Sequence, residues 1–509
     1  MSATDTGTTG CPHAQAHKAR HGTVFPVTAL AEFTLGPLMD ALNLAEFANR
    51  ADADVVESLT RTRGTFGADR PPAHAGLIRW SIDAFRNYRA AWRAHQAAVS
   101  ELVPVRSAWK ITHRRNAADQ RRVSRYEQTC WGRRYRSVDD SVREMWLLSL
   151  SAPMERREIV TLAAANVAAF GGDGVPEKVR VVLFGATSPV VEQVVERTAA
   201  QIRDQAQDKV APKLIEIVDG TARHPGRDCA SCPDVPACPA LAAADLLPDV
   251  PPAPGPRRTL SVTDLRYYRS CPAKYHLRRQ LKLRDTGLVE SRPVLVGRAV
   301  DETLRKRHTS GARRCRPDDA PGGDVATLLE DDRRTALEML ARHAALCPFP
   351  DVDEVPDDQH RFLVAHDSRL DVVFGGTPDL FYRRGDCWVW RETKTSRRRL
   401  RRDRSLLREV PQLALATLIL SARVPEGSPR GSRIELEQLR PDGCALEEVD
   451  PTDPALVAEA REVIGELVEP VLRDTAFVPA PGADCAKCEV RRWCAPGVEY
   501  LTANRRYAS

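Results

Sequence analysis

Long apolar runs are missing from this sequence of 509 residues. No stretch comes near the roughly 20 apolar residues that a membrane-spanning helix needs. The first twenty residues are polar, so they also lack the apolar core of a secretory signal. From these absences we expect a cytoplasmic protein.

A strong excess of one charge is missing as well. The chain has 75 Lys and Arg against 69 Asp and Glu, a net charge of +6. Such a mild excess does not by itself indicate a nucleic-acid partner, so local clustering of charge must decide. The 42% hydrophobic and 28% charged residues exclude a wholly disordered chain, and the length favours two to four domains. No phosphate-binding Gly-x4-Gly-Lys-Ser/Thr loop occurs, so a helicase partner would have to be another chain.

Six of the 13 cysteines form two triplets of identical spacing. Closely spaced thiols in a reducing compartment bind metal more often than they form disulfides. The sequence therefore predicts two metal centres, at Cys229-x2-Cys232-x5-Cys238 and at Cys485-x2-Cys488-x5-Cys494.

The two triplets end two halves of similar length, separated by residues 245–258. Five prolines in this segment favour a stiff, extended linker. The halves match without a gap at residues 27–37 and 262–272, and Gly132 and Trp146 have the same separation as Gly376 and Trp390. Each triplet also follows a segment with amphipathic helical spacing, at 192–210 and 453–472. Together these matches predict a duplication.

The second half alternates predicted helices and strands. Helices are expected at 261–268, 293–307 and 410–421, and strands at 370–374, 387–394 and 433–439. This alternation predicts an α/β fold with a central mixed sheet flanked by helices.

Charged residues cluster around one predicted strand of that sheet. Glu392 and Lys394 are two residues apart, so they project from the same face, and Asp379 reaches them if the preceding strand pairs with theirs. Adjacent carboxylates repel unless a cation neutralises them, and hard oxygen ligands suit Mg²⁺ or Mn²⁺. Such a site could polarise a phosphodiester and activate water for its hydrolysis.

The alternative is a surface hairpin with an ordinary ion pair. The residues before the motif, Trp388 to Trp390, favour a buried strand. Charged side chains on a buried strand need a partner charge or a metal ion. Five arginines that follow it suit contacts with DNA phosphates; they are Arg397, Arg398, Arg399, Arg401 and Arg402.

The second half resembles the RecB-like branch of the PD-(D/E)XK nucleases that carries an iron–sulfur cluster, as in the AddB nuclease domain and the CRISPR-adaptation exonucleases. The opening signature is similar to Ser261, Leu265 and Cys271-Pro272-x2-Tyr275. The first catalytic motif falls on Gly297 to Asp301, and the later ones on Asp379, on Glu392-Thr393-Lys394 and on Gln412-Leu413. The closing cysteines are Cys485, Cys488 and Cys494.

This resemblance implies a restriction-endonuclease-like fold and a metal-dependent deoxyribonuclease of exonuclease type. Asp301, Asp379, Glu392 and the carbonyl of Thr393 would hold Mg²⁺ or Mn²⁺, Lys394 would assist the attacking water, and Gln412 would orient it. Asp301 replaces the family's usual histidine. His308, two turns further along the same face of the helix, is expected at the surface, with a displaced metal ligand as the alternative.

The resemblance also implies that Cys271, Cys485, Cys488 and Cys494 ligate a [4Fe–4S] cluster, with a Zn²⁺ site as the alternative. The first half looks like an inactive copy, because the Gly132–Gly376 offset places Tyr135, Leu148 and Leu150 at the positions of Asp379, Glu392 and Lys394. Gly36 stands at the position that corresponds to Cys271, so Cys11 is the first candidate for the fourth ligand of Cys229, Cys232 and Cys238. The alternative is that these three cysteines bind no metal and only pack a loop.

The expected organisation is a flexible segment at 1–20, an inactive module with its triplet at 21–244, the linker at 245–258 and a nuclease module at 259–502. The main hypothesis is a DNA nuclease of repair, recombination or defence, working with a helicase or another subunit. The rival hypothesis is a non-catalytic DNA-binding or assembly subunit stabilised by its metal centres. A redox sensor is a third idea that no specific feature supports.

Overall fold

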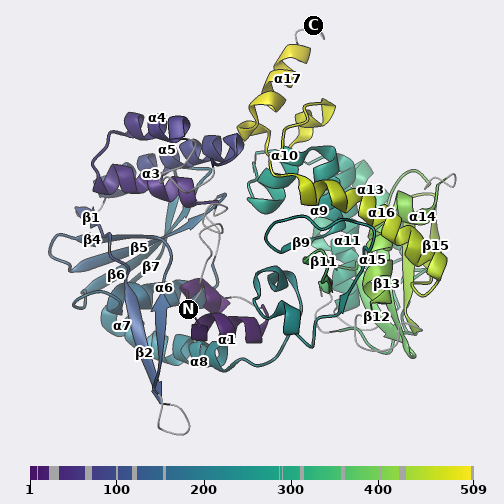
Figure 1. Cartoon of the computed structure of the whole chain (residues 1–509), viewed down its shortest axis with the longest axis horizontal. Helices are drawn as coiled ribbons and strands as arrows, with labels where there is room; N and C mark the ends of the chain where they lie inside the picture. Colours follow the sequence, from purple (N-terminus) through teal and green to yellow (C-terminus); the bar gives the residue numbers. More distant parts are fainter. Residues whose placement is uncertain are drawn as a thin grey trace. The chain divides into compact units, whose positions relative to one another are not determined.

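The computed structural model describes the chain except residues 8–9, 22–33, 63–71, 99–100, 117–122, 153–155, 286, 289, 310–313, 357–361, 400–403, 423–430 and 506–509. The chain forms two compact units (Figure 1). Unit 1 comprises residues 1–224, 271–288 and 476–509, and unit 2 comprises residues 225–270 and 289–475. Among the described residues, no helix combines the length and apolar character needed to cross a membrane.

Unit 1 is built around a five-stranded mixed sheet with the order β1-β4-β5-β6-β7. Strands β5 and β6 run parallel, whereas β4 and β7 are antiparallel to their neighbours. A separate hairpin joins β2 and β3. The strands are β1 (Leu102–Pro104), β2 (Lys110–Asn116), β3 (Val123–Thr129), β4 (Arg133–Ser137), β5 (Val142–Ser149), β6 (Lys178–Gly185) and β7 (Val191–Thr198).

Helices cover both faces of this sheet (Figure 1). The α-helices from the first half are α1 (Pro12–His21), α3 (Gly36–Phe47), α4 (Asp52–Thr62), α5 (Ala75–Ala98), α6 (Glu158–Phe170), α7 (Ala199–Gln205) and α8 (Ala211–Asp219), with the short helical segments η1 (Ala3–Gly7) and η2 (Ala206–Val210). The later segments add α10 (Pro272–Tyr275), η5 (His276–Gln280), η7 (Ala483–Lys487), η8 (Arg491–Trp493) and α17 (Ala495–Arg505). Much of the segment predicted to be flexible, 1–20, is therefore helical, and Ala3 and Ala16 are buried.

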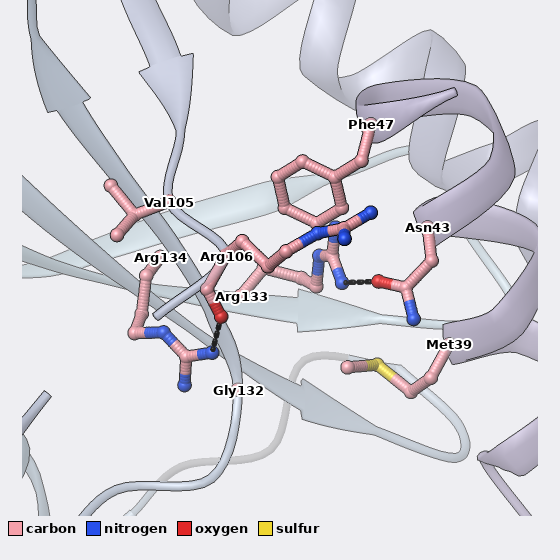
Figure 2. Close-up of a pocket in the computed structure, with 8 residues that line it drawn as sticks. All are labelled: Met39, Asn43, Phe47, Val105, Arg106, Gly132, Arg133 and Arg134. Atoms are coloured by element: carbon pink, nitrogen blue, oxygen red, sulfur yellow. Dashed lines mark hydrogen bonds between the residues drawn. The ribbon is translucent and has the colours of Figure 1, made fainter. Parts of the chain in front are cut away.

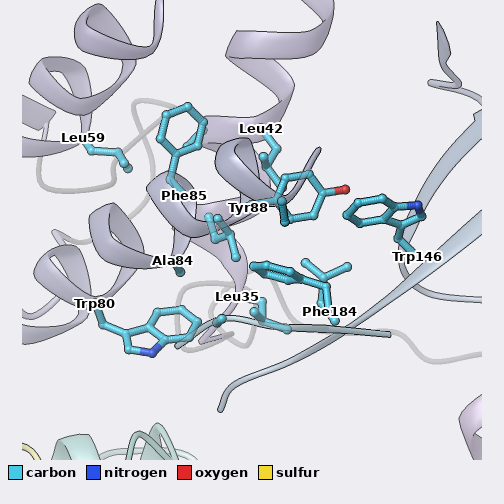
Figure 3. Close-up of a cluster of buried hydrophobic side chains, with 14 of the residues drawn as sticks. Leu35, Leu42, Leu59, Trp80, Ala84, Phe85, Tyr88, Trp146 and Phe184 are labelled. Atoms are coloured by element: carbon cyan, nitrogen blue, oxygen red, sulfur yellow. The ribbon is translucent and has the colours of Figure 1, made fainter. Parts of the chain in front are cut away.

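Alternation along the strands divides the apolar side chains between two cores. Trp146 and Leu148 of β5 contribute to a cluster with helices α3, α4 and α5, whereas Met145 and Leu147 contribute to a cluster with α6, α7 and α8. Figure 3 shows the first cluster, in which helical and sheet aromatics meet. The same cluster includes five residues from the later segments: Leu277, Leu281, Leu283, Val490 and Trp493.

Unit 2 contains two four-stranded sheets. One has the order β8-β10-β11-β9 and the other the order β12-β13-β14-β15. In the second sheet β13 and β14 run parallel, and β12 and β15 are antiparallel to their neighbours. The strands are β8 (Ala243–Ala244), β9 (Arg258–Leu260), β10 (Leu363–Asp367), β11 (Val372–Gly376), β12 (Leu380–Arg384), β13 (Cys387–Thr395), β14 (Arg433–Arg440) and β15 (Gly443–Val449).

The helices of unit 2 are those that the sequence predicts together with several others. They are α9 (Val262–Ser270), α11 (Arg292–Thr309), α12 (Gly323–Ala326), α13 (Glu330–His343), α14 (Leu406–Glu409), α15 (Pro411–Ser421) and α16 (Pro454–Arg473), with η3 (Arg227–Ser231) and η4 (Val235–Ala237). The expected α/β fold with mixed sheets flanked by helices is confirmed, and it is consistent with a restriction-endonuclease-like architecture.

The proline-rich segment 245–258 belongs to unit 2. Strands β8 and β9, at its two ends, pair with β10 and β11 of that unit. Leu246 and Leu247 are buried, and the backbone amides of both donate to the Asp367 carboxylate at 3.0 Å. Buried leucines and satisfied amides thus hold the segment against the sheet, so the units do not follow the predicted boundaries.

Two sequence-based expectations about unit 1 are wrong. Residues 191–198 form strand β7 instead of the first half of a helix. The paired strands also place Trp131, and not Tyr135, at the position of Asp379: Arg133 lies opposite Trp146, as Phe381 lies opposite Trp390. The hairpin between β4 and β5 is longer than the one between β12 and β13, which invalidates the offset without gaps.

Candidate functional site

The site predicted at Asp379, Glu392 and Lys394 lies where β12 begins beside β13. Asp379 immediately precedes β12, and its backbone N–H donates to the carbonyl of Arg391 at 3.0 Å. The backbone N–H of Thr393 donates to Asp379 Oδ2 at 2.7 Å, so the aspartate is fixed against the centre of the motif. The hairpin turn through Gly385, at φ +59°, brings the two strands together.

Glu392 is held at both carboxylate oxygens. Trp390 Nε1 donates to Oε1 at 2.9 Å, and Lys394 Nζ donates to Oε2 at 3.0 Å. Residues 390, 392 and 394 share one face of β13 because side chains alternate along a strand. Glu392 is only 5% exposed, so the structure places a carboxylate and an ammonium group together within a largely buried site.

Electrostatics in the site depend on this crowding. Burial, together with the negative charges of Glu392 and Asp301, raises the pKa of Asp379 to about 8. Burial opposes the charge of Lys394, but Glu392 and Asp379 outweigh it and raise the pKa of the lysine above its usual value. Lys394 is therefore a cation at neutral pH, and the acidic cluster favours any further positive charge.

Helix α11 supplies Asp301. Gly297 lies one helical turn earlier, and a Cβ atom there would stand 2.8 Å from Thr395 Oγ1 at the end of β13. A glycine at this position thus allows the helix to approach the strand closely. Asp301 is an exposed residue whose charge acts on Asp379.

Gln412 and the arginines predicted to contact DNA lie outside the strand pair that carries Asp379 and Glu392. Gln412 is the second residue of α15 and is half-buried. Arg397, Arg398 and Arg399 are exposed just beyond β13, and Arg397 donates to Thr335 Oγ1 at 3.3 Å. Arg401 and Arg402 lie outside the described residues.

The four cysteines Cys271, Cys485, Cys488 and Cys494 all belong to unit 1. Burial, with a contribution from Cys271, raises the pKa of Cys488 to about 11; burial, Cys271 and Cys485 raise that of Cys494. Backbone amides donate to two of the sulfurs, Ala480 N to Cys271 at 3.4 Å and Gly482 N to Cys485 at 3.5 Å. Cys271 thus acts on the pKa of Cys488 and of Cys494, and Cys485 acts on that of Cys494.

The earlier triplet, Cys229, Cys232 and Cys238, belongs to unit 2 and contributes to a small apolar cluster with β10 and β11. Its backbone repeats that of the later triplet: Gly226 N donates to Cys229 Sγ, as Gly482 N does to Cys485 Sγ. Cys11 belongs to unit 1, where its sulfur accepts from His224 N at 3.4 Å.

A basic pocket of about 250 Å³ opens at the start of β4 in unit 1 (Figure 2). Its lining includes Arg106, Arg133 and Arg134, and the guanidinium groups of Arg106 and Arg133 lie over the ring of Phe47. Arg133 is neutralised by Glu46 and also donates to Asn43. The pocket therefore has less free positive charge than its three arginines suggest.

Sequence reasoning missed a group of possible metal ligands in unit 2. It lies on the face of the β12-β13-β14-β15 sheet opposite Glu392 and Lys394. His308, Cys315, His343 and Cys347 are all buried, and their ligand atoms lie within 4.8 Å of one another. The expectation that His308 is at the surface is wrong: it is 7% exposed, because the end of α11 packs against α13 and Phe349. The His343-x3-Cys347 spacing was the available signal.

Comparison with family models finds a match for most of the second half of the chain. Residues 259–495 match the PD-(D/E)XK nuclease superfamily. The match indicates a nuclease-type fold for this region. A search of curated proteins finds no match to the chain.

Proposed function

We propose that the protein is a divalent-metal-dependent DNA nuclease whose active site is formed by Asp301, Asp379, Glu392, Thr393 and Lys394. The observation that carries the proposal is the pair of contacts that bring Asp379 against Thr393 N and Lys394 against Glu392. The family match to residues 259–495 supports the same chemistry.

The residues fit a hard divalent cation. The donors are carboxylate oxygens and a backbone carbonyl. Burial, together with the negative charges of Glu392 and Asp301, raises the pKa of Asp379, and a bound cation would favour its charged form. Asp301, Asp379, Glu392 and the carbonyl of Thr393 would hold Mg²⁺ or Mn²⁺. When bound, the metal would polarise a phosphodiester and lower the pKa of a water molecule.

The protein's own groups would orient the reactants. Lys394, a cation next to Glu392, would hold the attacking water or offset charge that develops on the phosphate. The exposed Arg397, Arg398 and Arg399 would contact the DNA backbone, and Gln412 would orient water or phosphate. By its resemblance to RecB-like enzymes, we infer an exonuclease of repair, recombination or defence that works with a helicase or another subunit.

The test is cleavage of linear and circular DNA, single- and double-stranded, with Mg²⁺ or Mn²⁺. Lys394→Ala should reduce the rate at least about a hundredfold, as expected for loss of a group that acts on the transition state. Lys209→Ala is the matched control, because Lys209 also pairs with a glutamate, Glu158, but at the surface of unit 1. Equal cleavage by the two variants would reject the site. DNA binding that survives chelation of metal, without cleavage by wild type, would favour a non-catalytic subunit.

We further propose that Cys271, Cys485, Cys488 and Cys494 ligate a [4Fe–4S] cluster. Amide donors to Cys271 and Cys485 support this, since N–H groups directed at sulfur stabilise thiolates. The triplet Cys229, Cys232 and Cys238 of unit 2 would be a second metal centre. Iron and labile sulfide in anaerobically purified protein should fall in Cys488→Ser but not in Cys130→Ser. Zinc in place of iron would reject the cluster.

We also propose that the two halves arose by duplication and that the first is inactive. Sheets β4-β5-β6-β7 and β12-β13-β14-β15 agree in strand order and direction. In unit 1 the positions of Asp379, Glu392 and Lys394 are occupied by Trp131, Leu148 and Leu150, whose side chains offer no oxygen ligand for a divalent metal ion.

A further inference from the structure

Two histidines and two cysteines converge between helices α11 and α13 of unit 2. His308 lies in the last turn of α11, and His343 is the last residue of α13. Cys315 and Cys347 lie in the segments that follow these helices. All four are buried, so one site joins parts of the chain that are 39 residues apart.

The distances within the group are those of a tetrahedral zinc site. Zn–N bonds of about 2.0–2.1 Å and Zn–S bonds of about 2.3 Å imply separations near 3.3 Å between two nitrogens and near 3.6 Å between nitrogen and sulfur. His308 Nε2 and His343 Nε2 are 3.2 Å apart, and Cys315 Sγ is 3.6 Å from His308 Nε2. Cys347 Sγ lies within 4.8 Å of the ligand atoms of the other three side chains.

The surroundings orient the group as they would orient metal ligands. His343 uses Nε2 toward the group, and its Nδ1 is 2.7 Å from Glu437 Oε1 on β14. A carboxylate on the second ring nitrogen is the usual way to fix the tautomer of a ligating histidine. The ring of His308 stacks on Phe349, with centroids 5.3 Å apart, and the N–H of Cys315 donates to Cys347 Sγ at 3.3 Å.

We propose that His308, Cys315, His343 and Cys347 bind one structural Zn²⁺ ion. The S₂N₂ donor set and tetrahedral spacing select zinc among common divalent metals. Four buried protein ligands leave no open position for substrate, so the ion has a folding role and not a catalytic one.

The site is directly linked to the nuclease motif. The second oxygen of Glu437, Oε2, accepts from Thr393 Oγ1 at 3.1 Å. Zinc would therefore fix His343, Glu437 and Thr393 in one chain of contacts on the face of the sheet opposite Glu392 and Lys394. It would also anchor the end of α11, the helix that carries Asp301. The zinc site itself does not depend on the proposed nuclease activity.

Metal content tests the proposal. Wild type should contain one equivalent of zinc more than Cys347→Ser and His343→Ala, whereas Cys387→Ser, a control for a half-buried cysteine in β13, should keep the wild-type content. Cys485→Ser should also keep it, which separates this ion from any metal at Cys271, Cys485, Cys488 and Cys494. Equal zinc in Cys347→Ser and Cys387→Ser would overturn the proposal.

Wild-type protein provides a second test in case the variants fail to fold. After replacement of zinc by Co²⁺, the folded protein should show sulfur-to-cobalt charge transfer and the intense visible bands of tetrahedral Co²⁺. These signals should persist in the Cys485→Ser protein loaded in the same way. Absence of tetrahedral bands, or peptide mapping that finds a Cys315–Cys347 disulfide in freshly purified protein, would overturn the assignment.

Discussion

Each carboxylate oxygen of Glu392 has its own donor, Trp390 on one side and Lys394 on the other. Trp146 has a similar bond in unit 1, to Glu144 Oε2 at 3.0 Å, but that glutamate also contacts His95 and Arg180. The same pair of residue types thus belongs to the candidate metal site in one sheet and to a network with His95 and Arg180 in the other.

We predict that Trp390→Phe weakens Mn²⁺ binding and cleavage by about ten- to a hundredfold, the range for loss of a partner that orients a ligand. Phenylalanine keeps most of the buried ring but removes the donor to Glu392. Manganese titration and cleavage rates give the result. Trp388→Phe is the control, since Trp388 stacks on Phe381. An unchanged metal affinity in Trp390→Phe would contradict the role of this bond.

Glu144 leads to a prediction of how the stability of unit 1 depends on pH. Burial opposes its charge, but His95, Trp146 and Arg180 outweigh burial and lower its pKa. Its charged form therefore stabilises unit 1 above the pKa of the unfolded chain, about 4.3, and this contribution is lost as pH falls through the lower folded value. Glu144→Gln should cost about 1.5–3 kcal/mol at pH 7 and progressively less below pH 4. Urea unfolding of wild type and Glu144→Gln between pH 7 and pH values below 4 measures this difference in the free energy of unfolding. A difference that does not vary with pH would contradict the prediction.

The motif at Glu392 could be predicted because its residues are neighbours on one strand, where spacing of two fixes a common face. The convergence of Asp379 required only that adjacent strands pair. The His308 group could not be found in this way, because its members come from two helices and two loops. Only the packing of α11 on α13 brings them together.

At the scale of elements, Gly297 sets how closely α11 approaches β13. A side chain there meets Thr395 Oγ1, so Gly297→Val should push the helix outward, move Asp301 and lower the cleavage rate about tenfold. Overpacking of this kind costs about 1–3 kcal/mol. The control is Gly323→Val, because a Cβ at Gly323 meets nothing within 4 Å. Thermal melts and cleavage rates give the result, and equal behaviour of the two variants would count against this contact.

Helix and strand predictions succeeded where one period dominates. The expected helix at 410–421 is α15, and the expected strand at 433–439 is β14. Residues 191–198 misled because Val191, Val194 and Val195 also suit a helical face. They form an edge strand because β6 offers a partner, which is a tertiary effect that spacing does not show.

At the scale of the whole molecule, the units are not contiguous in sequence. The aromatic core of unit 1 includes Leu277, Trp493 and three other residues that follow residue 244. Fully burying one large apolar side chain contributes about 1.5–3 kcal/mol, so five are comparable with the whole stability of a domain, about 5–15 kcal/mol.

We therefore predict that a fragment ending at residue 244 does not fold cooperatively by itself. Urea unfolding followed by circular dichroism should show no sharp transition for residues 1–244, whereas the full chain shows one. Adding fragment 245–509 should restore the transition. A cooperative transition in the isolated first fragment would mean that the later segments are dispensable.

The division of the chain could not be predicted from proline content. The prolines of residues 245–258 predict a linker, but Leu246, Leu247 and the carboxylate of Asp367 hold the segment on unit 2. Each cysteine triplet also belongs to the unit that contains most of the other half.

This interleaving imposes an order on biosynthesis. When the ribosome has translated the first 224 residues, the growing polypeptide still lacks Trp493 and Val490, which fill the space beside α5. The nascent first unit must wait, with apolar surface uncovered, until residues 490–493 have been translated. Chaperone capture of the nascent chain is the natural consequence of such a delay.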